Sequence, residues 1–294
     1  MNKSFYISDA VQNNVIFLYG DTGRNWLQNL PQFISTYENQ WKFKAGECFS
    51  DAQFNVVLNA FKNDKTEVVF KCCVPNKEFQ TEVKALAHYN GDGAVKLLKN
   101  DTENGAILLE KIKPGATLEK NNSIEDATQQ AILVCKKLHK PIQETSQFPT
   151  LQNWFDGLNR ASADAIDKQF IEKAKQLSRE LLSSQTKLVL LHGDLHYANL
   201  LSSSVGYTAI DPKGIVGEAE FEIPLPRVQN IVDQKELLSR VDCFIEQSHF
   251  DKKRIYAWLF SKAVLAACWT IEDSRAPNEQ TVQFLSVAES LKNV

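Results

Sequence analysis

The first 110 residues alternate between helical spacing of apolar positions and short apolar runs that are typical of strands. Apolar residues recur at intervals of three and four over 25–37, which predicts a helix that begins after a turn at 20–24. A second helical pattern covers 77–88. Runs rich in β-branched and aromatic residues predict strands at 41–49, 53–61, 67–74, 94–98 and 106–110. The short gaps between the first three runs predict antiparallel pairing.

The second part of the chain is mainly helical in pattern. Proline and glycine at 114–115 interrupt the regular spacing, which places a boundary or linker there. Apolar positions at helical spacing then predict helices at 124–139, 151–161 and 163–182, and three more within 228–294, one of which spans 254–273. We therefore expect two parts. Residues 1–110 hold an N-terminal helix, an antiparallel sheet and one further helix, and residues 111–294 hold the linker and the helical remainder.

Two short strands in the helical part end in polar residues at a specific spacing. An apolar run at 188–191 leads into a turn that carries Asp194 and, five residues later, Asn199; a second run at 207–210 ends at Asp211. Transfer of a phosphoryl group from ATP to a hydroxyl requires a carboxylate that accepts the hydroxyl proton. It also requires an amide oxygen and a second carboxylate that hold Mg²⁺ against the phosphates. The H-x-D-L-x-x-x-N spacing, followed by another aspartate, fits this requirement.

The two motifs together resemble a known family. Residues 192–199 read His-Gly-Asp-Leu-His-Tyr-Ala-Asn and residues 210–217 read Ile-Asp-Pro-Lys-Gly-Ile-Val-Gly. This resembles the aminoglycoside phosphotransferase superfamily, within it the streptomycin 6-kinase and hydroxyurea-type resistance kinase branch. The resemblance implies an α+β, protein-kinase-like two-lobed fold with an antiparallel-sheet N-lobe and a mainly helical C-lobe. It also implies ATP- and Mg²⁺-dependent transfer of the γ-phosphate to a hydroxyl of a small molecule, aminoglycoside-like or another polar or cationic alcohol.

The resemblance also implies a role for individual residues. Asp194 is the expected catalytic residue, and Asn199 and Asp211 are the expected metal ligands. The expected nucleotide-binding residues are Lys71 with its partner Glu82 (or, alternatively, Glu78), Glu110 and Ile112 at the hinge, and Lys213 near the γ-phosphate. His192 and Glu222 are expected to support the catalytic loop.

Acidic residues near the second motif are candidates for binding the substrate. Glu218, Glu220 and Glu222 follow Asp211 closely in the chain. Carboxylates pair well with ammonium and guanidinium groups, so Glu218 and Glu220 are candidate contacts for a cationic substrate. Asp273, beside Glu272 at the end of the predicted helix 254–273, is a third candidate. A solvated acidic turn explains the same residues equally well.

Three other interpretations remain open at this point. The polar residues of both loops are favoured in turns in any case and need only cap them. His192, Asp194 and His196 alternate like ligands of a metallohydrolase, although no second ligand group is apparent in the sequence. The third interpretation is a catalytically weak nucleotide-binding regulatory protein. It is suggested by the loop at 48–53, which has no glycine to form a phosphate-binding turn and carries the negative charge of Asp51.

Composition restricts the class of protein and its partners. The chain has 294 residues with 43% hydrophobic content, which is enough for a large core, and a net charge of −3. This balance gives no reason to expect nucleic acid or a membrane as partner, and a small molecule is expected instead. The six cysteines are scattered without C-x-x-C pairs, and neither a signal peptide nor an 18-residue apolar span is apparent, so a cytoplasmic protein is expected. No heptad seam indicates a coiled-coil dimer, and the oligomeric state stays open.

Overall fold

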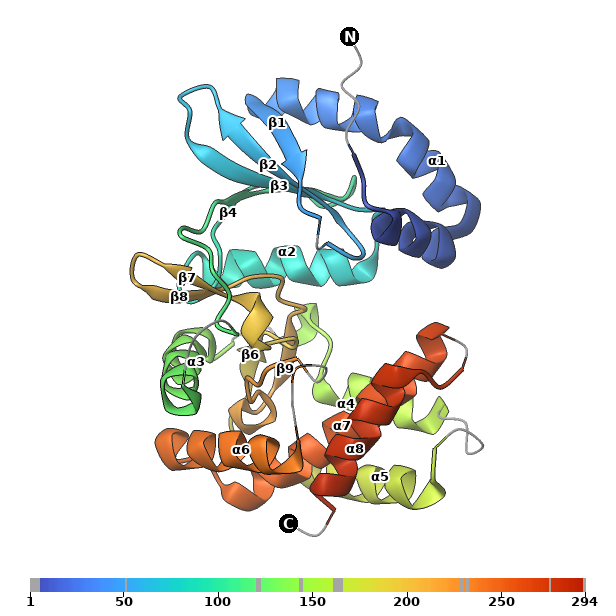
Figure 1. Ribbon diagram of the computed structural model, residues 1–294, viewed down its shortest axis with the longest axis vertical. Coiled ribbons are helices and arrows are strands. Elements are labelled where there is room, and N and C mark those ends of the chain that lie inside the picture. The colour runs from blue at the N-terminus through green and yellow to red at the C-terminus, as the bar shows by residue number, and fades with distance from the viewer. Residues whose placement is uncertain are drawn as a thin grey trace. The chain divides into compact units, whose positions relative to one another are not determined.

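The computed structural model describes residues 6–50, 52–119, 123–142, 145–160, 166–227, 230, 233–274 and 276–292. Asp51 lies outside the described residues. The chain divides into two compact units, Met1–Ile112 and Lys113–Val294, which Figure 1 shows in blue to green and in green to red. Each unit has its own architecture and is described separately.

The N-terminal unit is built on one five-stranded antiparallel sheet. Its strands lie in the order β1-β2-β3-β5-β4. Their bounds are β1 Phe43–Cys48, β2 Val56–Lys62, β3 Glu67–Cys72, β4 Leu97–Asp101 and β5 Ala106–Glu110. The predicted antiparallel sheet is confirmed, although β2 begins three residues later than predicted and β4 is shifted by three residues toward the C-terminus.

The two faces of this sheet have different neighbours because side chains alternate along each strand. Leu58, Phe70 and Leu108 are fully buried and pack in one hydrophobic cluster with α1 (Asp9–Trp41). Neighbouring residues point to the other face, where α2 (Lys77–Tyr89) lies (Figure 1). Lys71 is on this second face, next to Phe70 in β3.

The N-terminal helix is longer than its apolar pattern predicted. The chain is already helical from Asp9, where Ser8 caps the helix by accepting a hydrogen bond from the backbone N–H of Val11. Gly20 interrupts the helix with φ 56° and ψ −128°, a conformation that glycine adopts without a steric penalty. The predicted turn therefore reduces to a kink at Gly20, with a helical segment on both sides of it.

The C-terminal unit is mainly helical, as predicted. Its helices are α3 Ile124–Leu138, α4 Leu151–Phe155, α5 Lys168–Ser183, α6 Gln234–Ser248, α7 Lys252–Ser274 and α8 Glu279–Ser290. The predicted helix at 151–161 is wrong in its second half, because α4 passes into a 3-10 helix at Asp156–Arg160. The start predicted for the next helix, at 163, falls outside the described residues.

Two small antiparallel strand pairs carry the polar loops of this unit. β6 Val189–Leu191 pairs with β9 Ile215–Gly217, and β7 Leu200–Ser203 pairs with β8 Gly206–Ala209. The helices pack around the β6–β9 pair in one hydrophobic cluster. At its centre Phe221 is buried, with its ring centroid 5.4 Å from that of Trp258 in α7 and 6.1 Å from that of Phe155 in α4. Within the described ranges, no helix combines the length and the apolar character needed to cross a membrane.

Candidate active site

The two polar loops meet at one end of the β6–β9 pair. Leu191 lies opposite Ile215 and Val189 opposite Gly217, so the chain leaves β6 at the same end at which it enters β9. The His192 carbonyl oxygen there accepts hydrogen bonds from the backbone N–H groups of Lys213 (2.7 Å) and Gly214 (3.2 Å). The loop that carries Asp194 is thereby tied to the loop that carries Asp211.

Gly193 permits the tight turn between β6 and Asp194. Its φ is +87°, in the region that favours glycine. A Cβ atom at this position would lie 3.1 Å from Trp154 Cη2, 3.2 Å from Ile215 Cγ2 and 3.3 Å from Lys213 Cβ. Any side chain there would push the neighbouring loop and the Trp154 ring away, so both backbone conformation and space require glycine.

A buried carboxylate fixes the backbone of the Asp194 loop. Glu222 is 1% exposed, and its two oxygens accept hydrogen bonds from the backbone N–H groups of His192 (3.0 Å) and Gly193 (2.6 Å). The His139 Nε2 atom lies 2.9 Å from the same carboxylate. Burial acts to raise the pKa of Glu222, but the His139 contact, the electrostatic influence of His139 and His192, and the backbone hydrogen bond from Gly193 outweigh it and lower the pKa to about 2. Glu222 is therefore ionised throughout the physiological range.

His192 connects the two loops through its ring. The ring Nδ1 accepts a hydrogen bond from the Asp194 backbone N–H (3.2 Å), and the ring Nε2 lies 2.8 Å from the carbonyl oxygen of Ile210, the residue before Asp211. Burial lowers the pKa of His192, which favours the neutral imidazole. A neutral ring with its proton on Nε2 satisfies both contacts.

Asn199 is held by contacts to both loops. Its Nδ2 group donates to the Asp194 carbonyl oxygen (2.9 Å), and its own carbonyl oxygen accepts from the Ile210 backbone N–H (2.9 Å). Because the amide nitrogen is used in this way, the Oδ1 oxygen is oriented for another partner. Asp211 is exposed and has a positive φ of 59°, which turns the chain toward β9. The structure thus brings together the loops that carry Asp194, Asn199 and Asp211.

In the N-terminal unit, Lys71 and Glu82 form a buried ion pair. The Lys71 Nζ and Glu82 Oε1 atoms are 2.7 Å apart, and the two residues are 3% and 6% exposed. The pair joins β3 to α2. Glu78, the alternative partner, lies one helical turn before Glu82 and is exposed. A buried ammonium held by a carboxylate is suited to binding a phosphate group as a point charge.

The predicted hinge residues are partly engaged within the sheet. The Glu110 backbone N–H donates to the Lys96 carbonyl oxygen (3.1 Å), and the Glu110 side chain accepts from the Lys96 backbone N–H (2.7 Å). The N–H group of Glu110 is therefore already occupied and is not available for a nucleotide base. Ile112 and Lys213 are both half-buried.

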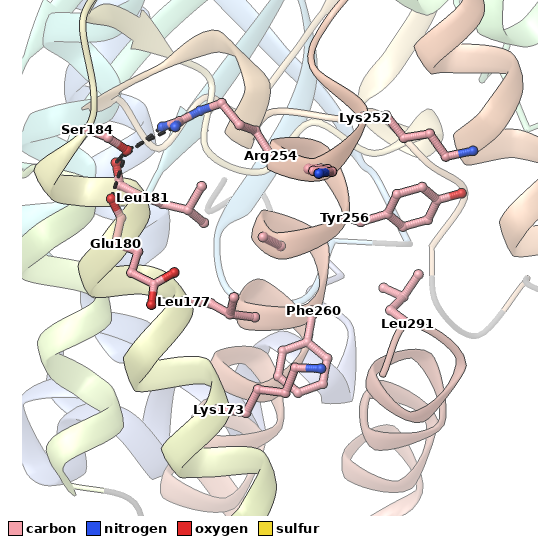
Figure 2. Close-up of a pocket in the computed structure, with 12 residues that line it drawn as sticks. Lys173, Leu177, Glu180, Leu181, Ser184, Lys252, Arg254, Tyr256, Phe260 and Leu291 are labelled. Carbon is pink, nitrogen blue, oxygen red and sulfur yellow. Dashed lines mark hydrogen bonds between the residues drawn. The ribbon is translucent and has the colours of Figure 1, made fainter. Parts of the chain in front are cut away.

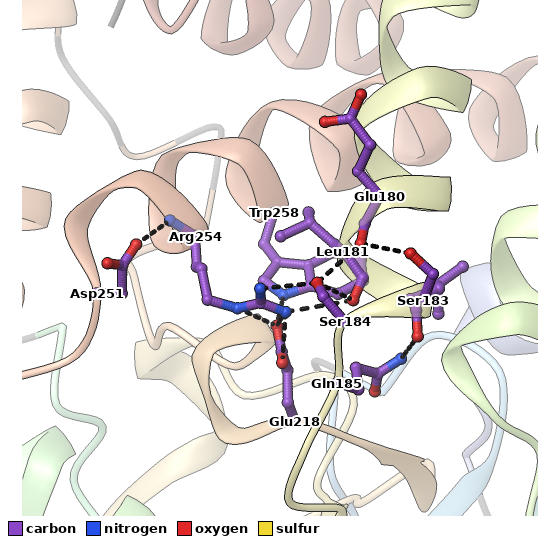
Figure 3. A network of polar contacts seen from close by, with 10 residues as sticks. Glu180, Leu181, Ser183, Ser184, Gln185, Glu218, Asp251, Arg254 and Trp258 are labelled. Carbon is purple, nitrogen blue, oxygen red and sulfur yellow. Dashed lines mark hydrogen bonds and ion pairs between the residues drawn. The ribbon is translucent and has the colours of Figure 1, made fainter.

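The predicted substrate carboxylates do not gather around Asp194. Glu218 follows β9 at the end opposite to Asp211 and is 4% exposed. Arg254 binds both of its oxygens at 2.7 Å through Nη2, and Trp258 Nε1 donates to it as well (Figure 3). The carboxylate is thus saturated by structural partners. Glu220 is half-buried near the same end, and Asp273 is exposed near the end of α7.

Two cavities in the C-terminal unit lie apart from the polar loops. One, of about 670 Å³, is lined from α5 and α7 by residues that include Lys173, Arg254 and Phe260 (Figure 2). The other, of about 660 Å³, is lined by residues that include His139, Glu218 and Glu220. Of the described residues that line these cavities, none belongs to the Asp194, Asn199 and Asp211 set.

The geometry does not favour a metallohydrolase. Both ring nitrogens of His192 are occupied by backbone contacts, so this ring has no lone pair for a metal. In the part of the chain that the structure describes, no group of three or more His, Cys, Asp or Glu side chains is arranged to hold a metal ion. His196 is largely buried, and burial lowers its pKa.

Two residues of the site carried no signal in the sequence. His139 is an isolated histidine at the end of α3, and Lys262 is one lysine within the apolar helix α7. His139 reaches Glu222 and Lys262 reaches the Phe221 ring only through the packing of their helices, which no local pattern reports.

Comparisons with known proteins place the chain among small-molecule kinases. A family described as aminoglycoside/hydroxyurea antibiotic resistance kinase matches residues 41–274. The chain is 25% identical to a streptomycin 6-kinase of Streptomyces glaucescens, over 92% of each chain. It is 26% identical to a hydroxyurea phosphotransferase of Kitasatospora aureofaciens, over 86% of this chain and 77% of that one. Its fold is similar to that of the choline kinase LicA from Streptococcus pneumoniae, with a TM-score of 0.63, 13% identity, and coverage of 90% and 99%.

Proposed function

Because the chain belongs to the aminoglycoside/hydroxyurea antibiotic resistance kinase family, we propose that the loops of Asp194 and Asp211 form its phosphoryl-transfer centre. The protein is a kinase that transfers a phosphoryl group from ATP to a hydroxyl of a small molecule. The observation that carries the assignment is the meeting of the two loops at His192, whose backbone and ring contact both of them.

Asp194 is the proposed catalytic residue. In the reaction the acceptor oxygen forms a bond to the γ-phosphorus, and the bond from that phosphorus to the β,γ-bridging oxygen breaks, which releases ADP. The proton of the acceptor hydroxyl passes to the Asp194 carboxylate. Hydrogen bonds to Glu222, His192 and Asn199 fix the backbone on both sides of Asp194, so the carboxylate needs little reorganisation during the reaction.

Asn199 and Asp211 are the proposed ligands of a divalent metal, which we take to be Mg²⁺. Oxygen donors suit this ion, and Mg²⁺ is typically held by one or two protein ligands together with phosphate oxygens. The Asn199 amide fits because its nitrogen is bound to the Asp194 carbonyl oxygen and its oxygen is directed elsewhere. When bound, the ion neutralises charge on the β- and γ-phosphates.

The remaining nucleotide contacts follow from the two basic residues and the linker. We propose that Lys71, held by Glu82, contacts the ATP phosphates and that Lys213 contacts the γ-phosphate. The base is proposed to pair with backbone groups around Ile112 and with the Glu110 carbonyl oxygen, since the Glu110 N–H is already bonded. In this proposal residues 1–110 and 111–294 act as the two lobes of the kinase. The reaction takes place in the cytoplasm, where ATP is supplied.

The proposed acceptor is a polar small molecule with a reactive hydroxyl. The names of the relatives point to streptomycin as the first compound to test, with antibiotic resistance as the corresponding role. The named relatives also include a hydroxyurea phosphotransferase, so hydroxyurea is the second compound to test. Glu218 is not proposed as a direct contact for a cationic acceptor, because Arg254 already binds both of its carboxylate oxygens.

The test is acceptor-dependent release of ADP by purified protein and by its Asp194→Asn variant. Loss of a general base typically costs a factor of about 10²–10⁴ in rate, so the variant should be at least 100-fold slower. ADP should still bind to the variant with wild-type affinity, since the side chain keeps its shape. Equal rates for the two proteins would refute the role of Asp194.

A further inference from the structure

Helix α7 places a lysine over the Phe221 ring. The Lys262 Nζ atom lies 5.0 Å from the centroid of the Phe221 ring, and Phe221 directly precedes Glu222. Burial lowers the pKa of Lys262, while the negative charges of Glu222 and Asp194 act to raise it. Among the described residues, no hydrogen-bond acceptor or ion-pair partner is found for Lys262.

Two tryptophans continue this surface beyond Phe221. The Trp154 ring centroid is 6.2 Å from that of Phe221 and 5.3 Å from that of Trp269, which it meets edge to face. Trp269 lies two helical turns after Lys262, so both residues are on the same side of α7. The Trp154 ring also packs on Gly193, the residue before Asp194. Lys262, Trp154 and Trp269 thus form one continuous surface beside the catalytic turn, which we call the α7 shelf.

The α7 shelf remains accessible to a ligand. Lys262, Trp154 and Trp269 are each half-buried, whereas Phe221 beneath them is 1% exposed. Tryptophan faces offer a large, rigid area on which the C–H groups of a ring compound can pack. A partly desolvated ammonium donates well to oxygen acceptors and repels a cationic group placed next to it.

We propose that the α7 shelf is the acceptor subsite, and that it selects a hydroxylated ring whose reacting hydroxyl is flanked by an uncharged or anionic oxygen group. The ring packs on Trp154 and Trp269, and Lys262 donates a hydrogen bond to the flanking oxygen. The hydroxyl is thereby presented to Asp194. This inference rests on the proposed role of Asp194 and adds the class of acceptor to it.

The experiment compares acceptor kinetics of the wild type with those of Lys262→Met and Lys262→Arg. Lys253→Met, an exposed lysine on the same helix, is the matched control. Acceptors are supplied from a fixed panel: myo-inositol and methyl glucoside as neutral ring compounds, glucuronate as an acid, and streptomycin as a cation. ADP release gives kcat and KM for each compound, and the KM for ATP is measured in parallel.

The wild type should prefer a neutral or acidic ring compound to streptomycin. Lys262→Met should lower kcat/KM for the preferred compound at least tenfold, mainly through its KM, and leave the KM for ATP within twofold. Lys262→Arg should recover part of the loss, because it restores the charge. Lys253→Met should match the wild type. If Lys262 had only a structural role, Lys262→Met would change the KM for ATP and the acceptor KM together. Lys262→Arg would then not restore the acceptor KM selectively.

Several outcomes would overturn the proposal. They are acceptor kinetics of Lys262→Met within twofold of the wild type, streptomycin as the best substrate of the wild type in the panel, and no turnover of any panel compound by the wild type. Trp269→Leu provides a second variant should Lys262→Met fold poorly, and it should raise the acceptor KM while ADP affinity is unchanged. If the role of Asp194 is itself wrong, Asp194→Asn will turn over the preferred acceptor at the wild-type rate, whatever the Lys262 variants do.

Discussion

Replacement of Glu222 by glutamine tests most directly whether the Glu222 carboxylate stabilises the catalytic loop. The carboxylate is 1% exposed and accepts hydrogen bonds from two backbone N–H groups, with His139 Nε2 at 2.9 Å as a third partner. Glutamine keeps the size of the side chain, but one of its two terminal atoms becomes an NH₂ group. That group would face an N–H donor, most directly the one of Gly193, 2.6 Å from the present oxygen.

The size of the effect follows from the pKa of Glu222. Its decrease from 4.5 to about 2 corresponds to about 3 kcal/mol in favour of the folded protein with an ionised carboxylate. Since the folded pKa lies below the unfolded one, this stability is present above pH 4.5 and is lost as the pH falls toward 2. Glu222→Gln should therefore lower the free energy of unfolding by about 3 kcal/mol at pH 7, and by progressively less in acid.

The assay is urea unfolding of the wild type and Glu222→Gln at several pH values between 7 and 2.5. Glu220→Gln, two residues earlier and half-buried, is the matched control and should change the free energy of unfolding by less than about 0.5 kcal/mol. A difference between wild type and Glu222→Gln that is constant over this pH range would refute the reasoning, because it would show that the charge of Glu222 contributes nothing.

Three further predictions concern other contacts of the site. Gly193→Ala should destabilise the protein by about 1–3 kcal/mol and slow turnover, because φ +87° strains alanine and the new Cβ contacts the Trp154 ring; thermal unfolding and kcat measure both effects. Arg254→Met should cost about 3–5 kcal/mol in urea unfolding without raising the KM for ATP, because it leaves the buried Glu218 carboxylate without its ion-pair partner. Glu82→Gln should raise the KM for ATP more than the acceptor KM, since Lys71 loses the charge that holds it.

The sequence predicted the sheet and the helices because their signals are local. Period-two alternation in β3 and period-three-and-four spacing in α3 depend on neighbouring residues only. The helix over 9–19 was missed because its apolar positions, such as Val11 and Val15, are separated by polar residues and are buried by tertiary packing against the rest of α1 and the sheet. The second half of the helix predicted at 151–161 failed for a comparable reason, since Gly157 packs against Leu265 and Trp269 of α7 in a 3-10 turn.

The partners of the acidic residues after β9 could not be predicted from the sequence. Their closeness to Asp211 along the chain favoured a substrate-binding role for Glu218 and Glu220. In the structure β9 carries the chain away from Asp211, and Glu218 meets Arg254 and Trp258 instead (Figure 3). The 3-10 helix Ala219–Phe221 then returns the chain, so that Glu222 reaches the backbone of Gly193. Glu218 and Glu222, four residues apart, thus have different partners, which their spacing alone does not distinguish.

Helix α7 links this polar network to the proposed acceptor subsite. Arg254 and Trp258, near the start of α7, bind Glu218, Lys262 lies over the Phe221 ring one turn further, and Trp269 meets Trp154 two turns beyond that. A single helix therefore contacts the end of β9, the segment that leads to Glu222 and the aromatic surface in order. Because a helix is rigid over such a length, loss of the ion pair between Arg254 and Glu218 should shift Lys262 relative to Asp194. Arg254→Met is consequently expected to raise the acceptor KM as well as to lower stability, whereas Lys262→Met should affect the acceptor KM alone.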